Sequence, residues 1–211
     1  MPEALSEPLV TEQLTKAGAA IERDSFDIID AEAGPRGYGA DQWAIVRRMI
    51  HASADFEMNG LVAFHPGAVE AGLTAMLRGS TPIVADVEMI CAGLSASRLG
   101  HFGLTTHQFI SDAEVIRQAQ REGTTRAVQA MRKAHGLGLL DGAIVGIGNA
   151  PTALIEVVRL MREEGARPAL VVGMPVGFVS AAESKELLAA QDEVPWMVVR
   201  GRKGGSTLVV A

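Results

Sequence analysis

The sequence predicts an α/β protein built in three layers, α/β/α, with a five-stranded parallel sheet in the middle. Five short, almost continuously apolar runs occur after residue 80, and amphipathic helices are expected between them. Such strands are typical of parallel sheets buried on both faces, because the crossover helices cover them. We expect one domain over residues 1–211, in which residues 1–80 form a mostly helical extension and residues 81–211 form the sheet core.

The five predicted strands are the runs PIVAD, HQFI, AIVGIG, ALVVGM and WMVVR, at residues 82–86, 107–110, 143–148, 169–174 and 196–200. Between them, apolar residues recur at helical spacing, as Leu154, Val157 and Met161 do, and Gly165 is placed to end that helix. Ahead of the sheet, the same spacing predicts three helices, at residues 13–33, 40–52 and 67–78.

The composition is that of an ordinary globular protein and excludes several classes of function. Hydrophobic residues make up 48% of the 211 residues and charged residues 21%, which is enough material for a core. The net charge is −6, without a Lys/Arg run that could follow a phosphate backbone, so nucleic acid is not an expected partner. One cysteine, Cys91, excludes an intrachain disulfide. The first ten residues lack a signal-peptide pattern, and no apolar run is long enough to span a membrane, so we expect a cytoplasmic protein.

The loops that follow the predicted strands contain the candidate ligand contacts. In an open parallel sheet, ligands bind beyond the carboxyl ends of the strands, where helix N-termini present free N–H groups. Four segments stand at such positions: residues 86–89, 148–152, 173–185 and 200–207. The candidate residues in them are Asn149, Thr152, Gly173, Gly177, Lys185, Arg200 and Arg202. Turn geometry alone also explains a glycine after a strand, so no single loop establishes a site.

The convergence of these loops carries more weight than any one of them. All four segments are expected on one rim of the sheet, together with Arg126. Backbone donors and cationic side chains gathered there would make a locally positive site on an acidic protein. The sequence therefore predicts a ligand with several carboxylates or with phosphate groups.

Motifs for nucleotides, hydrolysis and metals are weak or missing. GIGNAP, at residues 146–151, is one glycine short of a dinucleotide fingerprint, and no acidic residue ends the following strand. Neither a P-loop nor a G-x-S-x-G elbow is present. The five histidines do not have the spacing of metal ligands. A dinucleotide-dependent oxidoreductase nevertheless stays open as an alternative function.

His51 is the unusual residue of the stretch RMIHASADFE, at residues 48–57. It lies near the C-terminal end of the second predicted helix, where a cation interacts favourably with the last carbonyl groups. This placement fits a capping histidine, and it fits equally a histidine that is protonated near neutral pH and transfers a proton. Asp55, four residues later, could orient the ring if it comes within reach.

Six motifs in the same order resemble the precorrin-8X methylmutase family of cobalamin biosynthesis, including its cobalt-precorrin-8 branch. They are RRMIHASADF, FHPGAVEAG, TPIVADVEMI, GNAPTALIEV, PALVVGMPVGFVSAAESKE and VRGRKGGS, and the resemblance extends over about residues 21–206. The resemblance implies a flavodoxin-like fold and an isomerase that moves a methyl group from C-11 to C-12 of a tetrapyrrole. The product would be hydrogenobyrinic acid or its cobalt counterpart, cobyrinic acid.

The resemblance also implies site residues and an assembly. The family's catalytic histidine corresponds to His51, its substrate-contacting serine to Ser25, and the arginine of its T-R motif to Arg126. The enzyme would act as a homodimer without a cofactor of its own, and any cobalt would belong to the substrate. The apolar run LVAF, at residues 61–64, is a candidate for the dimer interface.

The chain departs from the family pattern at two positions beside the expected contacts. Asp24 stands where many members have a basic residue, and Ala127 stands where a serine is common. The segments TTRAVQAMRKA and FISDAEV favour the cobalt branch. Besides the oxidoreductase, a non-catalytic carrier that hands tetrapyrroles between enzymes stays open as an alternative.

Overall fold

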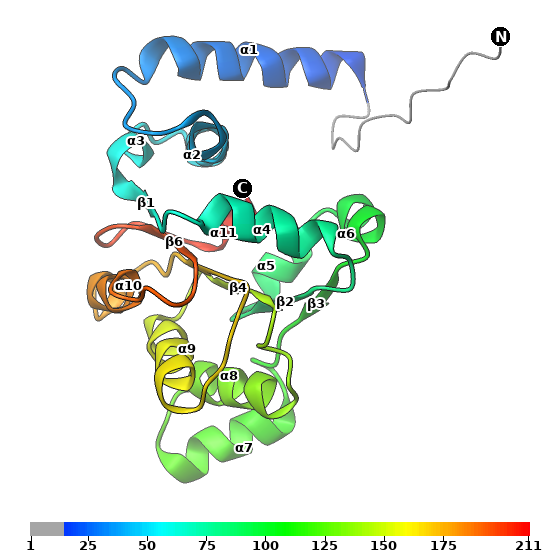
Figure 1. Ribbon diagram of the computed structural model, residues 1–211, viewed down its shortest axis with the longest axis vertical. Coiled ribbons are helices and arrows are strands. Elements are labelled where there is room, and N and C mark those ends of the chain that lie inside the picture. Colours follow the sequence, from blue (N-terminus) through cyan, green and yellow to red (C-terminus); the bar gives the residue numbers. More distant parts are fainter. Residues whose placement is uncertain (1–14) are drawn as a thin grey trace, which may run out of the picture.

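The computed structural model describes residues 15–211 of the chain. Six strands form one sheet in the order β1-β6-β5-β4-β2-β3 (Figure 1). Five of them pair in parallel, and β1 runs antiparallel to β6 at the edge. The strands are β1 (Val62–Phe64), β2 (Pro82–Ala85), β3 (Thr105–His107), β4 (Ile144–Ile147), β5 (Leu170–Gly173) and β6 (Trp196–Val199).

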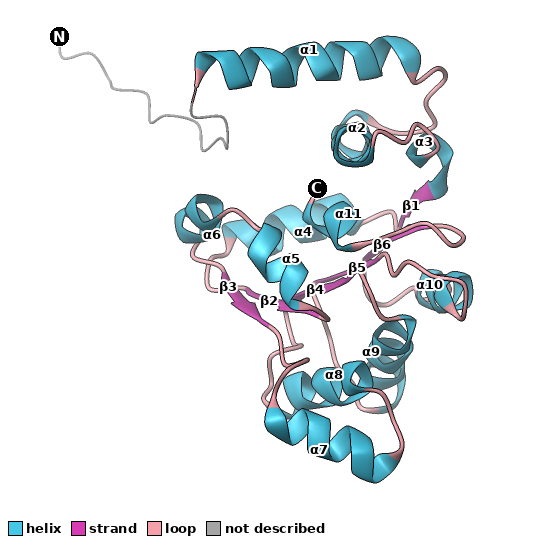
Figure 2. Ribbon diagram, turned by 180° about the vertical axis from the view of Figure 1, so that it is seen from behind, coloured by secondary structure: helices cyan, strands magenta, loops and turns pink. Residues whose placement is uncertain are grey.

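Helices cover both faces of this sheet, so the molecule is a mixed α/β protein in layers. α8, α9 and α10 lie on one face, and α4, α5 and α11 lie on the other (Figure 2). α7 packs outside α8, while α2 and then α1 lie beyond α11. The helices are α1 (Lys16–Glu32), α2 (Ala40–Ser53), α3 (Met58–Leu61), α4 (Ala68–Leu77), α5 (Glu88–Gly93), α6 (Ala96–Phe102), α7 (Ala113–Glu122), α8 (Arg126–Gly136), α9 (Pro151–Glu163), α10 (Ala181–Ala189) and α11 (Ser206–Val210).

The predicted sheet had five parallel strands, and the structure adds a sixth, antiparallel strand that the prediction missed. The run LVAF contributes β1, in which Val62, Ala63 and Phe64 pair with residues of β6. Val62 is buried within the chain, whereas Leu61, Ala63 and Phe64 are partly exposed, so the place of this run in a dimer interface stays a prediction. A three-residue antiparallel strand leaves little period-2 signal, which is why the pattern did not reveal it.

The other elements lie close to their predicted positions, with one clear shift. The second parallel strand is Thr105–His107 and not residues 107–110, because the chain turns after His107 and the Gln108 side chain accepts the N–H of Ile110 at 3.0 Å. The three helices predicted ahead of the core correspond to α1, α2 and α4. Gln13 and Leu14, the first residues of the first predicted helix, and the ten residues without a signal-peptide pattern lie outside the described range.

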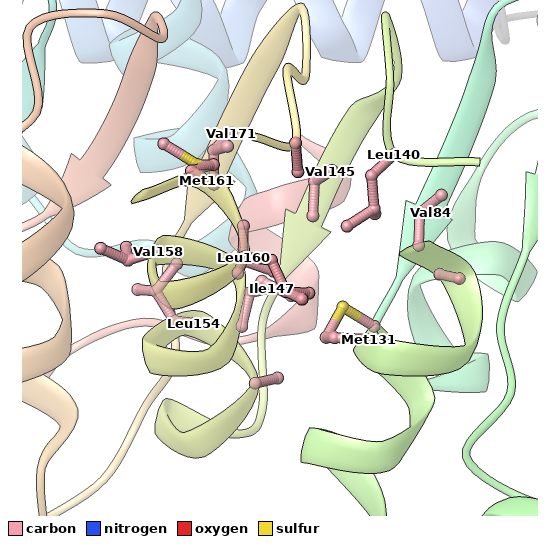
Figure 3. Close-up of a cluster of buried hydrophobic side chains, with 14 of the residues drawn as sticks. Val84, Met131, Leu140, Val145, Ile147, Leu154, Val158, Leu160, Met161 and Val171 are labelled. Atoms are coloured by element: carbon pink, nitrogen blue, oxygen red, sulfur yellow. The ribbon is translucent and has the colours of Figure 1, made fainter. Parts of the chain in front are cut away.

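The core between the sheet and α8 and α9 is mostly aliphatic. Apolar residues repeat along one side of α9, and Pro151 occupies its first turn, where a missing N–H costs nothing. Figure 3 shows part of this cluster, including Val84, Met131, Leu140, Val145, Ile147, Leu154, Val158, Leu160, Met161 and Val171. This tight packing fixes the strand ends from which the loops of the site emerge.

On the other face, polar contacts hold α1 to α2. The Asp30 carboxylate accepts hydrogen bonds from Trp43 Nε1 at 2.7 Å and from Arg47 Nη1 at 2.8 Å. Arg48 pairs with Glu22 at 2.6 Å. Within residues 15–211, none of the helices is both long and apolar enough to cross a membrane.

Candidate functional site

Loops that follow β4, β5 and β6 meet at the carboxyl edge of the sheet. The N–H of Gly205 donates to the carbonyl of Met174 at 2.8 Å. A Cβ atom on Gly148 would lie 2.7 Å from Cα of Ser206, so only glycine allows this approach of the two backbones. The structure thus brings the predicted strand-end segments together on one rim.

Asp86 stands at the end of β2 and joins that strand to the start of α9. Its carboxylate is fully buried and accepts the N–H groups of Gly148 at 3.0 Å, Asn149 at 2.9 Å and Ala150 at 2.7 Å. Burial raises the pKa of the Asp86 carboxyl, and the three backbone bonds oppose that rise. The backbone donors at this strand end are therefore taken by the protein itself, contrary to our expectation that they face a ligand.

Side chains beside this turn still line an open hollow of about 530 Å³. Arg126 begins α8, Asn149 and Thr152 come from the turn into α9, and all three lie on the wall of the hollow. Thr125 Oγ1 and Thr152 Oγ1 are 2.9 Å apart, which ties the two helix starts together. Arg126 is exposed, so its guanidinium can meet a carboxylate in the hollow.

Ala127, the departure beside Arg126, is buried and lines the same hollow. The two helices are further joined by Glu156, which accepts hydrogen bonds from Arg132 Nε at 2.8 Å and from Arg159 Nη2 at 2.5 Å. This buried carboxylate fixes α8 relative to α9. The wall that carries Arg126 and Thr152 is therefore a rigid part of the fold.

Lys185 does not lie where a ligand could reach it. Its side chain has 0% exposure, and Nζ donates to the carbonyl of Lys203 at 2.7 Å. Burial lowers the pKa of this ammonium to about 8. The predicted contact with a substrate carboxylate does not fit this position, because the lysine instead supports the loop after β6 from within.

The two arginines of that loop are exposed and point to different partners. Arg200 Nη1 pairs with Glu186 at 3.0 Å on the surface of α10. Arg202 has its guanidinium 5.6 Å from the ring centre of Phe178. Only Arg202 thus lies beside the loop after β5, and Arg200 would have to leave Glu186 to bind a ligand.

The loop after β5 presents an unusual apolar surface. Phe178 is 86% exposed and Val179 is 81% exposed, with Val176 close by in the sequence. Gly177 has φ of 153°, a conformation that favours glycine, and its N–H donates to the carbonyl of Arg202 at 3.2 Å. Large exposed apolar side chains are typical of an interaction or ligand-binding surface, and here a cation lies beside them.

Gly173, by contrast, has a packing role. A Cβ atom there would lie 2.7 Å from Leu188 and 3.0 Å from Leu154, so its absence lets α9 and α10 approach the end of β5. The sequence could not separate this role from ligand contact, because both place a glycine at a strand end. The structure places Gly173 in the core and not on the rim.

His51 lies exposed in the last turn of α2, as the sequence predicted. Its ring contacts the ring of Phe26 in α1, with 5.2 Å between the ring centres. Ser25, the neighbour of Phe26, donates its hydroxyl to the carbonyl of Ile21 at 2.8 Å. The structure therefore brings the Ser25 region of α1 and the His51 turn of α2 side by side, with Asp24 exposed next to them.

Asp55 does not serve as the partner of His51. Its Oδ2 pairs with Lys203 Nζ at 2.5 Å, and Oδ1 accepts the N–H of Glu57 at 3.0 Å. The hydrogen bond from Lys203 holds the pKa of the Asp55 carboxyl below its usual value. The sequence placed Lys203 in a basic loop but gave no sign of this contact, since 148 residues separate the two.

A second, apolar cavity of about 490 Å³ lies on the other face of the sheet, between α2, α4 and α11. Asp41 is the one charged residue among those that line it, and no lysine or arginine does. It therefore lacks the cations that an anionic ligand needs. Across residues 15–211, histidine, cysteine, aspartate and glutamate nowhere gather in a group that could hold a metal ion.

Comparison with known proteins gives one consistent result. The family model described as "Precorrin-8X methylmutase" matches residues 20–211. The chain is 48% identical to the "Cobalt-precorrin-8 methylmutase" of Leptospira interrogans, over 94% of this chain and 92% of that protein, and 40% identical to the "Precorrin-8X methylmutase" of Pseudomonas aeruginosa, over 92% of each.

A solved structure extends this likeness to three dimensions. It is described as "Crystal Analysis of Precorrin-8x Methyl Mutase from Thermus Thermophilus", with a TM-score of 0.83, 52% identity, and coverage of 90% of this chain and 92% of that one. Sequence and fold agree over nearly the whole length. The chain therefore belongs to the precorrin-8X methylmutase family, isomerases of cobalamin biosynthesis that move a methyl group within one molecule.

Proposed function

We propose that this protein moves a methyl group from C-11 to C-12 of a precorrin-8 tetrapyrrole, with His51 as proton donor and acceptor. The observation that carries the proposal is the shared rim: a histidine, exposed arginines and an exposed apolar loop all belong to elements at or beside the carboxyl edge of the sheet. Such a ligand has several carboxylates around a large apolar ring, so it needs cations and apolar side chains together.

The chemistry asks for a proton and not for an oxidant or a hydride. A proton placed on the macrocycle draws electrons toward it, the methyl group migrates to the neighbouring carbon, and the same proton is then removed. Substrate and product have the same atoms and the same oxidation state. His51, exposed in the last turn of α2, can take both roles, because an imidazole can both donate and accept a proton. We propose that the enzyme works without a cofactor of its own.

Arg126 and Arg202 are the proposed partners of substrate carboxylates, and Phe178 is the proposed contact of the apolar ring. Arg126 lines the hollow beside Asn149 and Thr152, and Arg202 lies over Phe178. Ser25 stays a proposed contact, since it lies in α1 next to Phe26, which touches His51. Arg200 can contribute only after release from Glu186.

Of the two branches we propose the cobalt-containing substrate, on the segments TTRAVQAMRKA and FISDAEV. Overall identity does not separate the branches, because two relatives named for cobalt-precorrin-8 are 48% identical to this chain and the Thermus protein named for precorrin-8X is 52% identical. We further propose a homodimer, in which α1 offers the exposed apolar residues Ile21 and Ile28. Light scattering at micromolar concentration tests this assembly.

Conversion separates the mutase from its two alternatives. Mixing the protein with precorrin-8X or its cobalt form should change the absorption spectrum and give a product of unchanged mass, in many turnovers per protein. A carrier would bind the tetrapyrrole and return it unaltered. An oxidoreductase would bind NAD(P)H or a flavin at micromolar concentration, and the Asp86 carboxylate that fills the backbone cradle at the α9 start argues against that.

A further inference from the structure

Lys203 forms a bridge between two distant parts of the chain. Its Nζ lies 2.5 Å from Asp55 Oδ2 and 2.7 Å from Glu57 Oε2. Lys203 belongs to the loop after β6, and the two carboxylates belong to the turn directly after α2. We call this contact the Lys203 bridge. It links the rim of the sheet to the helix that carries His51.

Hydrogen bonds from the interior of the protein fix the backbone of the loop that carries Lys203. The carbonyl of Lys203 accepts the hydrogen bond from buried Lys185 at 2.7 Å. Two residues later, the N–H of Gly205 donates to the carbonyl of Met174. Gly204 lies directly against that carbonyl, where a side chain would not fit. The loop therefore presents Lys203 from a fixed position.

The helix end of the bridge is equally well defined. α2 ends at Ser53, and the next residue, Ala54, caps it with a left-handed backbone of φ 53°. Asp55 then folds back on itself: its carboxylate accepts the N–H of Glu57 at 3.0 Å, and its own N–H donates to Ser53 Oγ at 3.3 Å. The carboxylate that holds Lys203 is thus part of the turn that stops the helix four residues after His51.

His51 has few anchors of its own. Its ring is exposed and stacks obliquely against Phe26, and within residues 15–211 it makes neither a hydrogen bond nor an ion pair. The position of its ring relative to the rim therefore depends on where the last turn of α2 stands. Met49 and Ile50 of that turn are buried in the core, its exposed side contacts α1 through Phe26, and the bridge ties the residues directly after it to the loop after β6.

We propose that Lys203 is a positioning residue, which sets the distance between His51 and the strand-end loops that hold the substrate. The inference rests on the proposed role of His51. An exposed ion pair contributes little to stability. A misplacement of about 1 Å at a reacting group can nevertheless cost about 100-fold in rate. The bridge should therefore matter for turnover much more than for folding.

The test compares Lys203→Met with a matched control. Lys133 makes the same kind of bridge, with Nζ 3.0 Å from Asp112 and 3.0 Å from Glu114, again two carboxylates two residues apart. That bridge joins α8 to the start of α7, away from His51. We expect Lys203→Met to lower kcat by about 10-fold or more, with KM within about twofold of wild type. Lys133→Met should leave both constants unchanged, and Lys203→Arg should restore most of kcat.

A second measurement does not need turnover. In NMR spectra of the imidazole groups, assigned with His51→Ala, the His51 signals should shift or broaden in Lys203→Met and stay unchanged in Lys133→Met. A large rise in KM with unchanged kcat would make Lys203 a substrate contact and overturn the proposal. Unchanged kcat and unchanged His51 signals would overturn it as well. If wild-type protein converts no substrate, the proposed function fails, and the NMR comparison still decides whether Lys203 positions His51.

Discussion

The carboxylate of Asp86 accepts the N–H of Gly148 at 3.0 Å and so joins the ends of β2 and β4. β2 and β4 are neighbours at the topological switch point of the sheet, because the chain adds β3 on one side of β2 and β4 on the other. Open α/β sheets commonly bind their ligands at this point. Here the cradle of N–H groups holds an internal carboxylate. Recognition of an anionic substrate therefore falls to side chains on the rim and not to the start of α9.

This relationship predicts a chemical rescue. Asp86→Ala leaves three backbone N–H groups without their acceptor and should cost about 3 kcal/mol or more of unfolding free energy. In a chain of this size, that corresponds to roughly 6–12 °C in Tm. Formate can supply the missing carboxylate, so it should raise the Tm of Asp86→Ala. Chloride at the same ionic strength is the control, and equal effects of the two anions would refute the cradle.

The second prediction uses the buried amine of Lys185. Its pKa is lowered from 10.5 to about 8 in the folded protein, so between these pH values the unfolded chain binds more protons than the folded one. The contribution of Lys185 to stability therefore rises as pH rises from 8 to 10.5, by up to about 3 kcal/mol. Lys185→Met lacks this titration. Urea unfolding at a series of pH values measures the free energy of unfolding of both proteins. Between pH 8 and 10.5 the value for wild type should rise relative to that for the variant, and a constant difference between the two would contradict the prediction.

The third prediction concerns Arg126 and substrate charge. Arg126→Ala should weaken binding of the tetrapyrrole by roughly 1.5–3 kcal/mol if the guanidinium meets a carboxylate. Binding to wild type should also weaken as salt is added, and this dependence should be smaller in the variant. Arg117→Ala, an exposed arginine in α7 that does not line the hollow, is the matched control. Equal dissociation constants for Arg126→Ala and wild type would remove Arg126 from the site.

Much of the sheet could be read from the sequence because its strands are buried on both faces. Runs such as residues 143–148 and 169–174 are apolar throughout, and the structure has β4 and β5 within them. β1 was not predicted and β3 was predicted a few residues too late in the chain, because a three-residue strand is too short to show an alternating pattern. Helices α2, α4 and α9 were predicted because apolar residues recur at helical spacing over several turns and residues typical of turns flank the helix ends.

The site was only partly predictable, for a physical reason. Residue type and position after a strand indicate which loops reach the rim, and that expectation held for the loops of Gly148, Met174 and Gly205. They do not indicate which way a long side chain turns. Lys185 turned inward to a backbone carbonyl, and Lys203 turned to Asp55 across the fold. The sequence also does not show that the Asp86 carboxylate accepts the backbone N–H groups of residues 148–150, because this contact depends on the pairing of β2 with β4.

The last prediction concerns His51 itself. His101 provides a matched control, since it also lies exposed in the last turn of a helix, α6, with its ring against a phenylalanine, Phe102. His51→Ala should fold and bind the tetrapyrrole almost as wild type does, because the exposed ring makes one aromatic contact and no hydrogen bond among residues 15–211. Its rate at saturating substrate should fall by about 100-fold or more, the usual scale for a general acid–base group. His101→Ala should turn over normally. If His51→Ala forms product as fast as His101→Ala, His51 only ends the helix, and the proton must come from another group.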